Sequence, residues 1–189
     1  MGRKRQVLLL FASVILLGGL YMNTFGRYFT SEGVFYACER GLHYGPSERI
    51  LKEYKNSQGD TVIIGKCENG LSIINAERKM FGLWGLSDGM ITGLVPPNDG
   101  EDILFIHNYK DNVIMGITGN NEIKSVNVSI KSKDSGRERI FDIKTDDDGF
   151  FFLENIEEIE QGETFYIVTA RDEEGKNIEM LKMTRINNI

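Results

Sequence analysis

The stretch Ser125-Val126-Asn127-Val128-Ser129-Ile130-Lys131 decides the fold class of this chain. Apolar Val126, Val128 and Ile130 alternate with polar residues, and successive side chains of a strand point to opposite faces of its sheet. The alternation predicts an antiparallel strand with one face in a core and the other in water. We therefore expect a mainly β protein.

Short β-like runs continue from this strand in both directions at fairly even spacing. They are separated by turn residues such as Asp134-Ser135-Gly136 and Asp172-Glu173-Glu174-Gly175, since Asp and Gly are typical of tight turns. Many short strands with regular turns predict an antiparallel β-sandwich or small barrel over residues 101–189. The runs are 103–107, 113–118, 125–131, 139–145, 150–153, 164–171 and 177–183.

Residues 125–184 resemble a known kind of module. Asp148-Gly149-Phe150-Phe151 and the aromatic-rich run Thr164-Phe165-Tyr166-Ile167-Val168 are similar to a turn and a strand of bacterial immunoglobulin-like and carboxypeptidase-regulatory-like β-sandwich modules. The resemblance implies an Ig-like β-sandwich portion that serves as a scaffold or binding domain. The layout of the whole chain also looks like small anchored proteins of Gram-positive bacteria.

Residues 27–95 are predicted to form an α+β subdomain. Residues 27–45 are rich in aromatic residues and Gly, which favours a short strand and a loop. A helix is expected over 47–56, because Pro46 suits a first helical turn. The apolar residues that would share one face of this helix are Ile50, Leu51 and Tyr54.

A hairpin is the strongest local prediction in the first half of the chain. Asn69-Gly70 tolerates the positive φ angles of a type I′ turn, and β-rich sequence flanks it, so we expect a hairpin over 61–77. The break Pro96-Pro97-Asn98-Asp99-Gly100 separates this subdomain from the next.

Residues 1–26 are predicted to form a cytoplasmic basic tip and a transmembrane helix. Residues 6–26 carry no charge, and as a helix they would reach about 30 Å, the thickness of the hydrocarbon core. Arg3-Lys4-Arg5 precedes them, so the positive-inside rule keeps the N-terminus cytoplasmic. Tyr21 and Phe25 fall where interfacial aromatics are expected.

Two alternatives to an anchor stay open. A cleaved secretory signal has the same basic start and apolar middle, and Thr24-Phe25-Gly26 is its best cleavage site, in which case the protein is secreted. A core helix of a soluble protein is the other, but such helices rarely have apolar residues on every side.

Charge excludes one class of partner. The net charge of −6 becomes −9 for residues 6–189, once the three N-terminal cations are set aside. Nucleic-acid phosphates and anionic lipid headgroups would repel this acidic body. We expect no nucleic-acid partner, and no electrostatic membrane surface mode beyond the N-terminal segment.

Cys38 and Cys67 are the two cysteines of the chain. Outside the cytoplasm such a pair can persist as a disulfide, and a loop of this length would stabilise the fold by about 3 kcal/mol in the chain-entropy model. The alternative is two buried free thiols.

No catalytic, cofactor or metal site is predicted. The sequence lacks nucleophile-elbow, zinc-protease and phosphate-loop patterns, and we interpret His43 and His107 as loop or surface residues. Asp146-Asp147-Asp148-Gly149 could begin a calcium loop. Phe150 and the two aromatics after it occupy the region where further ligands would lie, so a solvated hairpin turn is the preferred interpretation.

The best candidate contact surface is an aromatic segment in the first half of the chain. Aromatic anchors dominate many interfaces, although ordinary core packing is the alternative. The candidate residues are Phe81, Leu83, Trp84 and Leu86.

These observations favour a single-pass, membrane-anchored, extracytoplasmic protein. We expect a non-enzymatic binding or structural module of the cell envelope, whose partner is an envelope protein or a wall component. Two alternatives remain: an extracytoplasmic hydrolase with a carboxylate site, and a sensory or inhibitory subunit of a membrane complex.

Overall fold

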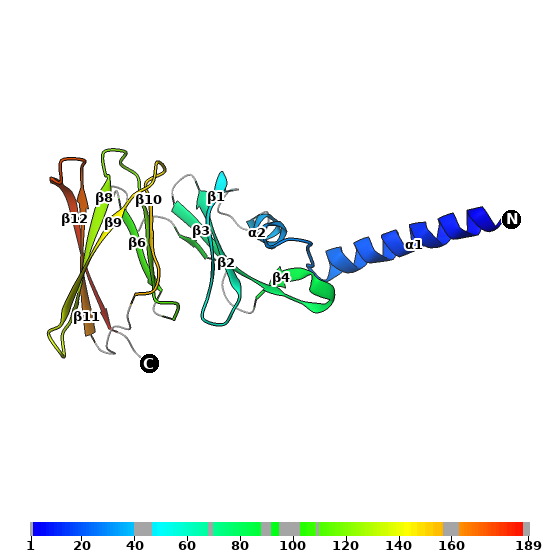
Figure 1. Ribbon diagram of the computed structural model, residues 1–189, viewed down its shortest axis with the longest axis horizontal. Helices are drawn as coiled ribbons and strands as arrows, with labels where there is room; N and C mark the ends of the chain where they lie inside the picture. Colours follow the sequence, from blue (N-terminus) through cyan, green and yellow to red (C-terminus); the bar gives the residue numbers. More distant parts are fainter. Residues whose placement is uncertain are drawn as a thin grey trace. The chain divides into compact units, whose positions relative to one another are not determined.

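The computed structural model describes residues 2–39, 47–67, 70–87, 92–94, 103–108, 110–156 and 163–186. Strands form 49% of the chain and helices 22%, so the protein is mainly β with an apolar N-terminal helix. The chain divides into two compact units (Figure 1). The first comprises Met1–Glu68 and Ser72–Gly93 and the second Asn69–Leu71 and Leu94–Ile189. We call them unit 1 and unit 2.

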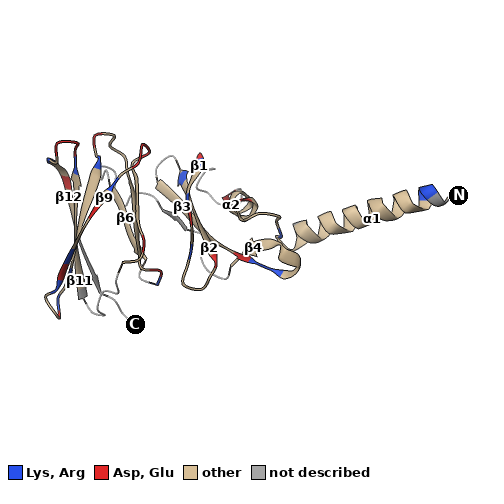
Figure 2. Ribbon diagram, viewed as in Figure 1, with Lys and Arg blue, Asp and Glu red and all other residues tan. Residues whose placement is uncertain are grey.

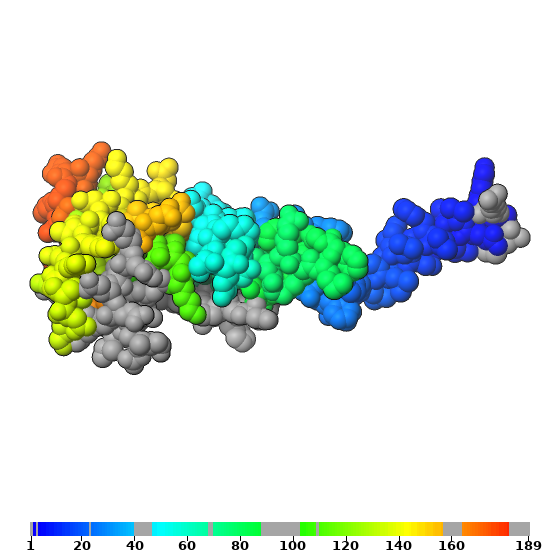
Figure 3. Space-filling view, turned by 60° about the horizontal axis from the view of Figure 1, so that its bottom comes forward, coloured from blue at the N-terminus to red at the C-terminus, as the bar shows by residue number. Residues whose placement is uncertain are grey.

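Unit 1 begins with helix α1, Arg3–Thr24. Its charged residues lie at its N-terminal end (Figure 2), and its side chains are uncovered on the face shown in Figure 3. After the helix, Gly26 has a φ of +56°, and the Arg27 N–H donates to the Met22 carbonyl at 2.9 Å. This glycine cap satisfies a terminal carbonyl, so α1 has a defined end.

Unit 1 continues with a short helix, α2 (Ser31–Glu39), and one sheet. The sheet order is β1-β2-β3-β4, and β5 pairs with β3. A 3-10 turn, Met80–Gly82, connects β3 to β4. The neighbouring strands β2 and β3 coincide with the hairpin predicted at 61–77. The strands are β1 (Arg49–Lys55), β2 (Thr61–Cys67), β3 (Gly70–Arg78), β4 (Trp84–Leu86) and β5 (Thr92–Leu94).

The prediction of a helix over 47–56 is wrong, because this segment contains strand β1, Arg49–Lys55. A bulge lies between Ile50 and Lys52, where the register against β2 shifts by one residue. An extra residue in a strand breaks the strict two-residue alternation of side chains. The apolar spacing of this strand therefore imitates that of a helix, and pairing with β2 overrides the local pattern.

The prediction of a short strand within 27–45 is also wrong, because the described part of this segment, residues 27–39, contains helix α2. Thr30 precedes the helix, and its Oγ1 accepts a hydrogen bond from the Gly33 N–H at 3.0 Å. This is N-cap geometry, in which a side-chain oxygen satisfies a free helical N–H. The cap and packing on the sheet outweigh the low helix propensity of the aromatic and β-branched residues.

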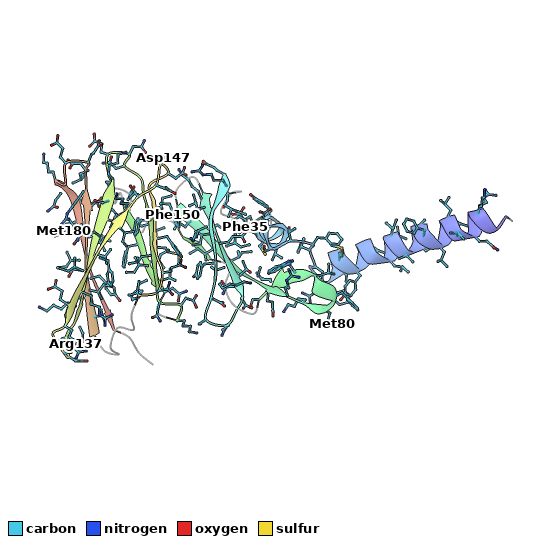
Figure 4. The ribbon with its side chains drawn as sticks, viewed as in Figure 1. Phe35, Met80, Arg137, Asp147, Phe150 and Met180 are labelled. Carbon is cyan, nitrogen blue, oxygen red and sulfur yellow. The ribbon has the colours of Figure 1, made fainter. Side chains whose placement is uncertain are left out.

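Helix α2 covers one face of the unit 1 sheet. Val34 and Phe35 of α2 are fully buried with Ile63 of β2 and Ile74 of β3, and Figure 4 labels Phe35. A Cβ on Gly65 would overlap the Phe35 ring. A glycine at this position of β2 therefore lets the helix approach the sheet closely.

Unit 2 is built from two antiparallel sheets. Within the described residues one has the order β10-β7-β6 and the other β12-β11-β8-β9. Each of the seven runs expected from the sequence is a strand. Their bounds are β6 (Ile103–Asn108), β7 (Val113–Thr118), β8 (Ser125–Ser132), β9 (Glu138–Lys144), β10 (Phe150–Leu153), β11 (Glu163–Arg171) and β12 (Asn177–Ile186).

The two sheets of unit 2 share one hydrophobic core. Ile114 of β7 and Phe151 of β10 are buried in the same cluster as Val128 of β8 and Val168 of β11. The alternating Val126, Val128 and Ile130 are all buried, as the alternation predicts. Apolar side chains from both sheets thus hold this unit together.

The prediction that His107 is a loop or surface residue is wrong. His107 lies in β6, is buried, and its Nδ1 is 3.0 Å from the Tyr166 Oη of β11. A buried polar group needs a hydrogen-bond partner, and this pair links the two sheets. His43 lies outside the described residues.

Candidate functional site

The predicted contact residues lie in two different environments. Phe81 is on the turn after β3 and is 84% exposed. Trp84 and Leu86 are half-buried and pack against the core of unit 1, and Leu83 is half-buried too. Core packing therefore describes Trp84 and Leu86, whereas Phe81 is available for contact.

The Trp84 ring is covered by two basic side chains. The Arg78 guanidinium carbon lies 4.9 Å from the ring centroid and the Lys55 Nζ lies 5.5 Å from it. Cations at this distance are attracted to the negative face of an indole ring. These contacts tie β1 and the end of β3 to β4.

Backbone hydrogen bonds connect the end of α1 to this strand. The Tyr28 N–H donates to the Trp84 carbonyl at 2.8 Å, and the Trp84 N–H donates to the Tyr28 carbonyl at 2.7 Å. The Arg27 guanidinium lies against Gly85, where a Cβ would overlap its Nη1. The residues that leave α1 are thus part of the same local structure as β4.

Several exposed apolar side chains lie close in sequence to Tyr28 or to Trp84, the two residues of this bridge. Phe25 is 57% exposed, Phe29 77% and Met80 71%, and Figure 4 marks Met80 on the turn. The sequence prediction included Phe25 as an interfacial aromatic and Phe81 as a contact residue. It missed Met80, which directly precedes Phe81, and Phe29, which lies four residues after Phe25.

A buried polar cluster lies inside unit 1. Glu39, at the end of α2, is only 4% exposed, and its carboxylate accepts hydrogen bonds from the Ser47 N–H at 2.9 Å and from the Ser47 hydroxyl. The Ser47 Oγ is also 3.5 Å from the Cys67 Sγ. Hydrogen bonds of this kind offset the cost of burying a carboxylate, so the cluster joins α2 to the entry of β1.

Both cysteines are free thiols in this structure, and the disulfide stays a prediction. Burial raises the pKa of Cys38, and the neighbouring Glu39 carboxylate adds to the effect. Burial also raises the pKa of Cys67, with Glu39 and Glu48 contributing, although the Ser47 hydrogen bond acts the other way. Because the thiolate is the reactive form, these thiols are poor nucleophiles at neutral pH.

The acidic turn of unit 2 connects β9 to β10. The Asp146 Oδ1 accepts hydrogen bonds from the N–H groups of Asp148 and Phe150, both at 2.9 Å. This oxygen is therefore engaged with the turn's own backbone, as in an Asx turn. In the part of the chain that the structure describes, no group of three or more His, Cys, Asp or Glu residues is placed to hold a metal ion.

Unit 2 carries an open groove of about 460 Å³ on its surface. It is lined by β9 residues, among them Ile140 and Phe141, and by Leu153 and the residues that follow β10. Ile140 is mostly exposed, so the groove presents apolar surface to the solvent.

No known protein family matches the chain, and no curated protein matches it.

Proposed function

We propose that this protein is a single-pass membrane protein whose two β units lie outside the cytoplasm, as a non-enzymatic binding or structural module of the cell envelope. The observation that carries the proposal is α1. It is long and apolar enough to cross a membrane, and none of its span Lys4–Met22 is buried within the structure.

The exposure of α1 favours lipid as its surroundings. Its large apolar side chains from Val7 to Leu20 are 51–71% exposed. Burying one such side chain fully is worth about 1.5–3 kcal/mol, so covering the whole helix is worth on the order of 10 kcal/mol or more. A core helix of a soluble protein would be covered by its own chain, which α1 is not.

The orientation follows from the charges at the two ends of α1. Arg3, Lys4 and Arg5 precede the apolar span, whereas the body that follows is acidic. Basic residues are retained on the cytoplasmic side, and this favours export of the β units. A cleaved signal would export them equally well, so cleavage is an outcome that the experiment below separates.

The strand order of unit 2 supports an immunoglobulin-like module. Its first, second and fifth strands form one sheet and its third, fourth, sixth and seventh the other. The constant-type immunoglobulin domain divides its strands in the same way except for the fourth, which joins the other sheet. Domains of this architecture frequently serve as binding modules at cell surfaces.

Several polar groups of unit 1 are engaged in structural contacts, which supports binding over catalysis. The Glu39 carboxylate accepts hydrogen bonds from Ser47, the Ser47 Oγ lies 3.5 Å from the Cys67 Sγ, and Arg78 lies over Trp84. The groove with Ile140 is the surface of unit 2 that we assign to an envelope protein or wall component.

Topology is tested with the full-length chain. Alkaline phosphatase fused after residue 189 is expected to be active, and the intact mass of the membrane-bound protein should include residues 1–26. Replacing Arg3, Lys4 and Arg5 by Glu should reduce export. A soluble cytosolic product would contradict the anchor, and a product that starts near residue 26 would show a cleaved signal.

Binding is tested by cross-linking the anchored protein in intact envelopes, followed by mass spectrometry. The wild-type chain should capture a specific partner, and Ile140→Asp should lose it. Gln58→Asp, an exposed change in unit 1, is the control. Capture that Ile140→Asp leaves unchanged would remove the groove from the proposal.

A further inference from the structure

Four exposed apolar side chains lie close in the chain to the junction of α1 with the unit 1 sheet: Phe25, Phe29, Met80 and Phe81. We call them the interfacial patch. We propose that this patch is a second membrane contact, which lies in the headgroup region on the side where α1 leaves the bilayer. The inference rests on the proposed membrane anchoring.

The glycine cap of α1 keeps the chain close to the helix end. The Phe25 N–H donates to the Tyr21 carbonyl at 3.0 Å, and the Arg27 N–H returns to Met22. These bonds wrap the exit of the chain around the last helical turn. Phe25 is therefore held at the end of the apolar span rather than on a free linker.

The bridge between Tyr28 and Trp84 of β4 then connects the turn after β3 to the end of α1. Tyr28 pairs with Trp84 and lies four residues after Thr24, a path of at most about 14 Å. Phe81 lies three residues from Trp84, at most about 11 Å. These upper bounds keep Met80 and Phe81 on the side of the membrane where the hydrocarbon core ends and α1 leaves it, and in Figure 4 the labelled Met80 lies beside that end of the helix.

The conformation of Phe81 is unusual for an aromatic residue. Its φ is 62°, in the left-handed region that bulky residues rarely adopt. The turn is closed by the Leu83 N–H bond to the Met80 carbonyl and by the Lys79 N–H bond to the Leu83 carbonyl. An exposed Phe that is held in this way contributes nothing to the core of unit 1, and such outliers point to a functional contact.

The charges around the patch fit a lipid surface. Arg78 and Lys79 directly precede Met80, Lys79 pairs with Glu77, and Figure 2 shows basic residues beside this turn. Apolar side chains flanked by cations are typical of segments that lie in a bilayer interface. The acidic body as a whole would be repelled by anionic lipids, so apolar insertion at this patch, rather than net charge, provides the contact.

Tryptophan fluorescence of the full-length protein in phosphatidylcholine vesicles tests the proposal. Trp84 is the sole tryptophan, so each reporter is introduced into a Trp84→Phe background: Phe81→Trp in the patch, Phe11→Trp in α1 and Glu48→Trp as the control. Glu48 lies beside Arg49, at the end of β1 opposite Lys55, about 20 Å along the strand. Lys55 is the end that reaches Trp84.

Lipids whose acyl chains are brominated on the carbons close to the headgroup quench tryptophan that lies at the interface as well as tryptophan within the bilayer. We expect Phe11→Trp and Phe81→Trp to lose at least about twofold in emission and Glu48→Trp to be nearly unchanged. Quenching of Phe11→Trp without quenching of Phe81→Trp would overturn the patch and leave the anchor standing. Absence of quenching at Phe11→Trp would overturn both. A blue-shifted but unquenched Phe81→Trp would identify a protein contact, such as a second copy, and would also overturn the lipid assignment.

The native tryptophan provides a second measurement that does not need the Trp84→Phe change. Quenching of Trp84 by the same lipids should fall when Met80 and Phe81 are both replaced by Asp. The matched control, with Ser57 and Gln58 of the β1–β2 turn replaced by Asp, should retain the wild-type quenching. Equal quenching in wild type and in the Met80/Phe81 double variant would contradict the proposal.

Discussion

Both units place a glycine within a strand where a second element comes close, but the two close approaches differ in kind. Gly116 of β7 is closed in by its own sheet, by the Leu104 carbonyl of β6 and the ring of Phe151. Phe151 is its cross-strand partner in β10. Gly65 of β2 is closed in by side chains, Phe35 of α2 and Ser47.

The difference indicates which unit can accommodate a larger side chain in place of its glycine. Strands in a hydrogen-bonded ladder keep a fixed spacing of about 4.8 Å, so a backbone carbonyl beside Gly116 has nowhere to move. A helix that packs on a sheet through side chains can shift by small amounts. We therefore expect substitution of Gly116 to destabilise unit 2 more than substitution of Gly65 destabilises unit 1.

The largest expected effect is that of Gly116→Val. The new side chain would overlap backbone as well as the Phe151 ring, so we expect unit 2 to lose about 4 kcal/mol or more of its free energy of unfolding. Hydrogen exchange by mass spectrometry in detergent micelles measures it through the amides of β7 and β8. Gly175→Asn is the control, because Asn tolerates the positive φ of that turn. Native-like protection in Gly116→Val would refute the comparison.

Gly65→Ala should have a smaller effect on unit 1. The methyl group meets the Phe35 ring and Ser47, which can move, so we expect a loss of about 1–3 kcal/mol. Urea unfolding followed by Trp84 fluorescence reports it, since Trp84 packs against this core. Adding Phe35→Leu should recover part of the loss. A cost as large as that of Gly116→Val would erase the distinction between the units.

Arg78→Ala should cost unit 1 about 0.5–1 kcal/mol, the usual range for a cation over an exposed indole face. The emission of Trp84 should change as well, because the guanidinium lies over its ring. Lys79→Ala is the matched control, since Lys79 pairs with Glu77 instead. Identical unfolding curves for Arg78→Ala and Lys79→Ala would show that the stacking adds nothing.

The smallest effect concerns the thiols under reducing conditions. Burial raises the pKa of Cys38 and Cys67 above the ordinary value of 9.0, so the folded state binds these protons more tightly than the unfolded state. Their contribution to stability is full below pH 9.0 and is lost as pH rises through the raised pKa values. Unfolding midpoints measured from pH 8 upward should fall more steeply in wild type than in the Cys38→Ala/Cys67→Ala variant. Parallel curves would mean that burial does not shift these groups.

The sequence predicts unit 2 better than unit 1 for a physical reason. Runs such as 125–131 alternate cleanly and are bounded by turns that contain Asp, Asn, Ser and Gly, so local signals and the shared core agree. In unit 1 the bulge at β1 and the low helix propensity of α2 put local and tertiary signals in conflict. The Thr30 cap and Glu32 in the first turn were local signals for α2, and the aromatic residues that follow obscured them.

The candidate site was predicted in part. Phe81 was included because it lies in an aromatic segment with Trp84, and such segments are typical of contact surfaces and of cores alike. The burial of Glu39, its bonds to Ser47 and the pairing of His107 with Tyr166 all depend on residues distant in the chain. Spacing carries no information about such contacts, and they could not be inferred before the fold was known.

The bulge in β1 has a consequence beyond its effect on sequence interpretation. Among the described strands, β1 is at the end of its sheet, and an end strand offers unpaired backbone groups to any passing chain. Lys52, Glu53 and Lys55 place charges along this strand, and the irregular register spoils its match to a second straight strand. With the anchor that we propose, copies of this protein would share one membrane surface, and the charged, irregular edge of β1 would disfavour strand pairing between them.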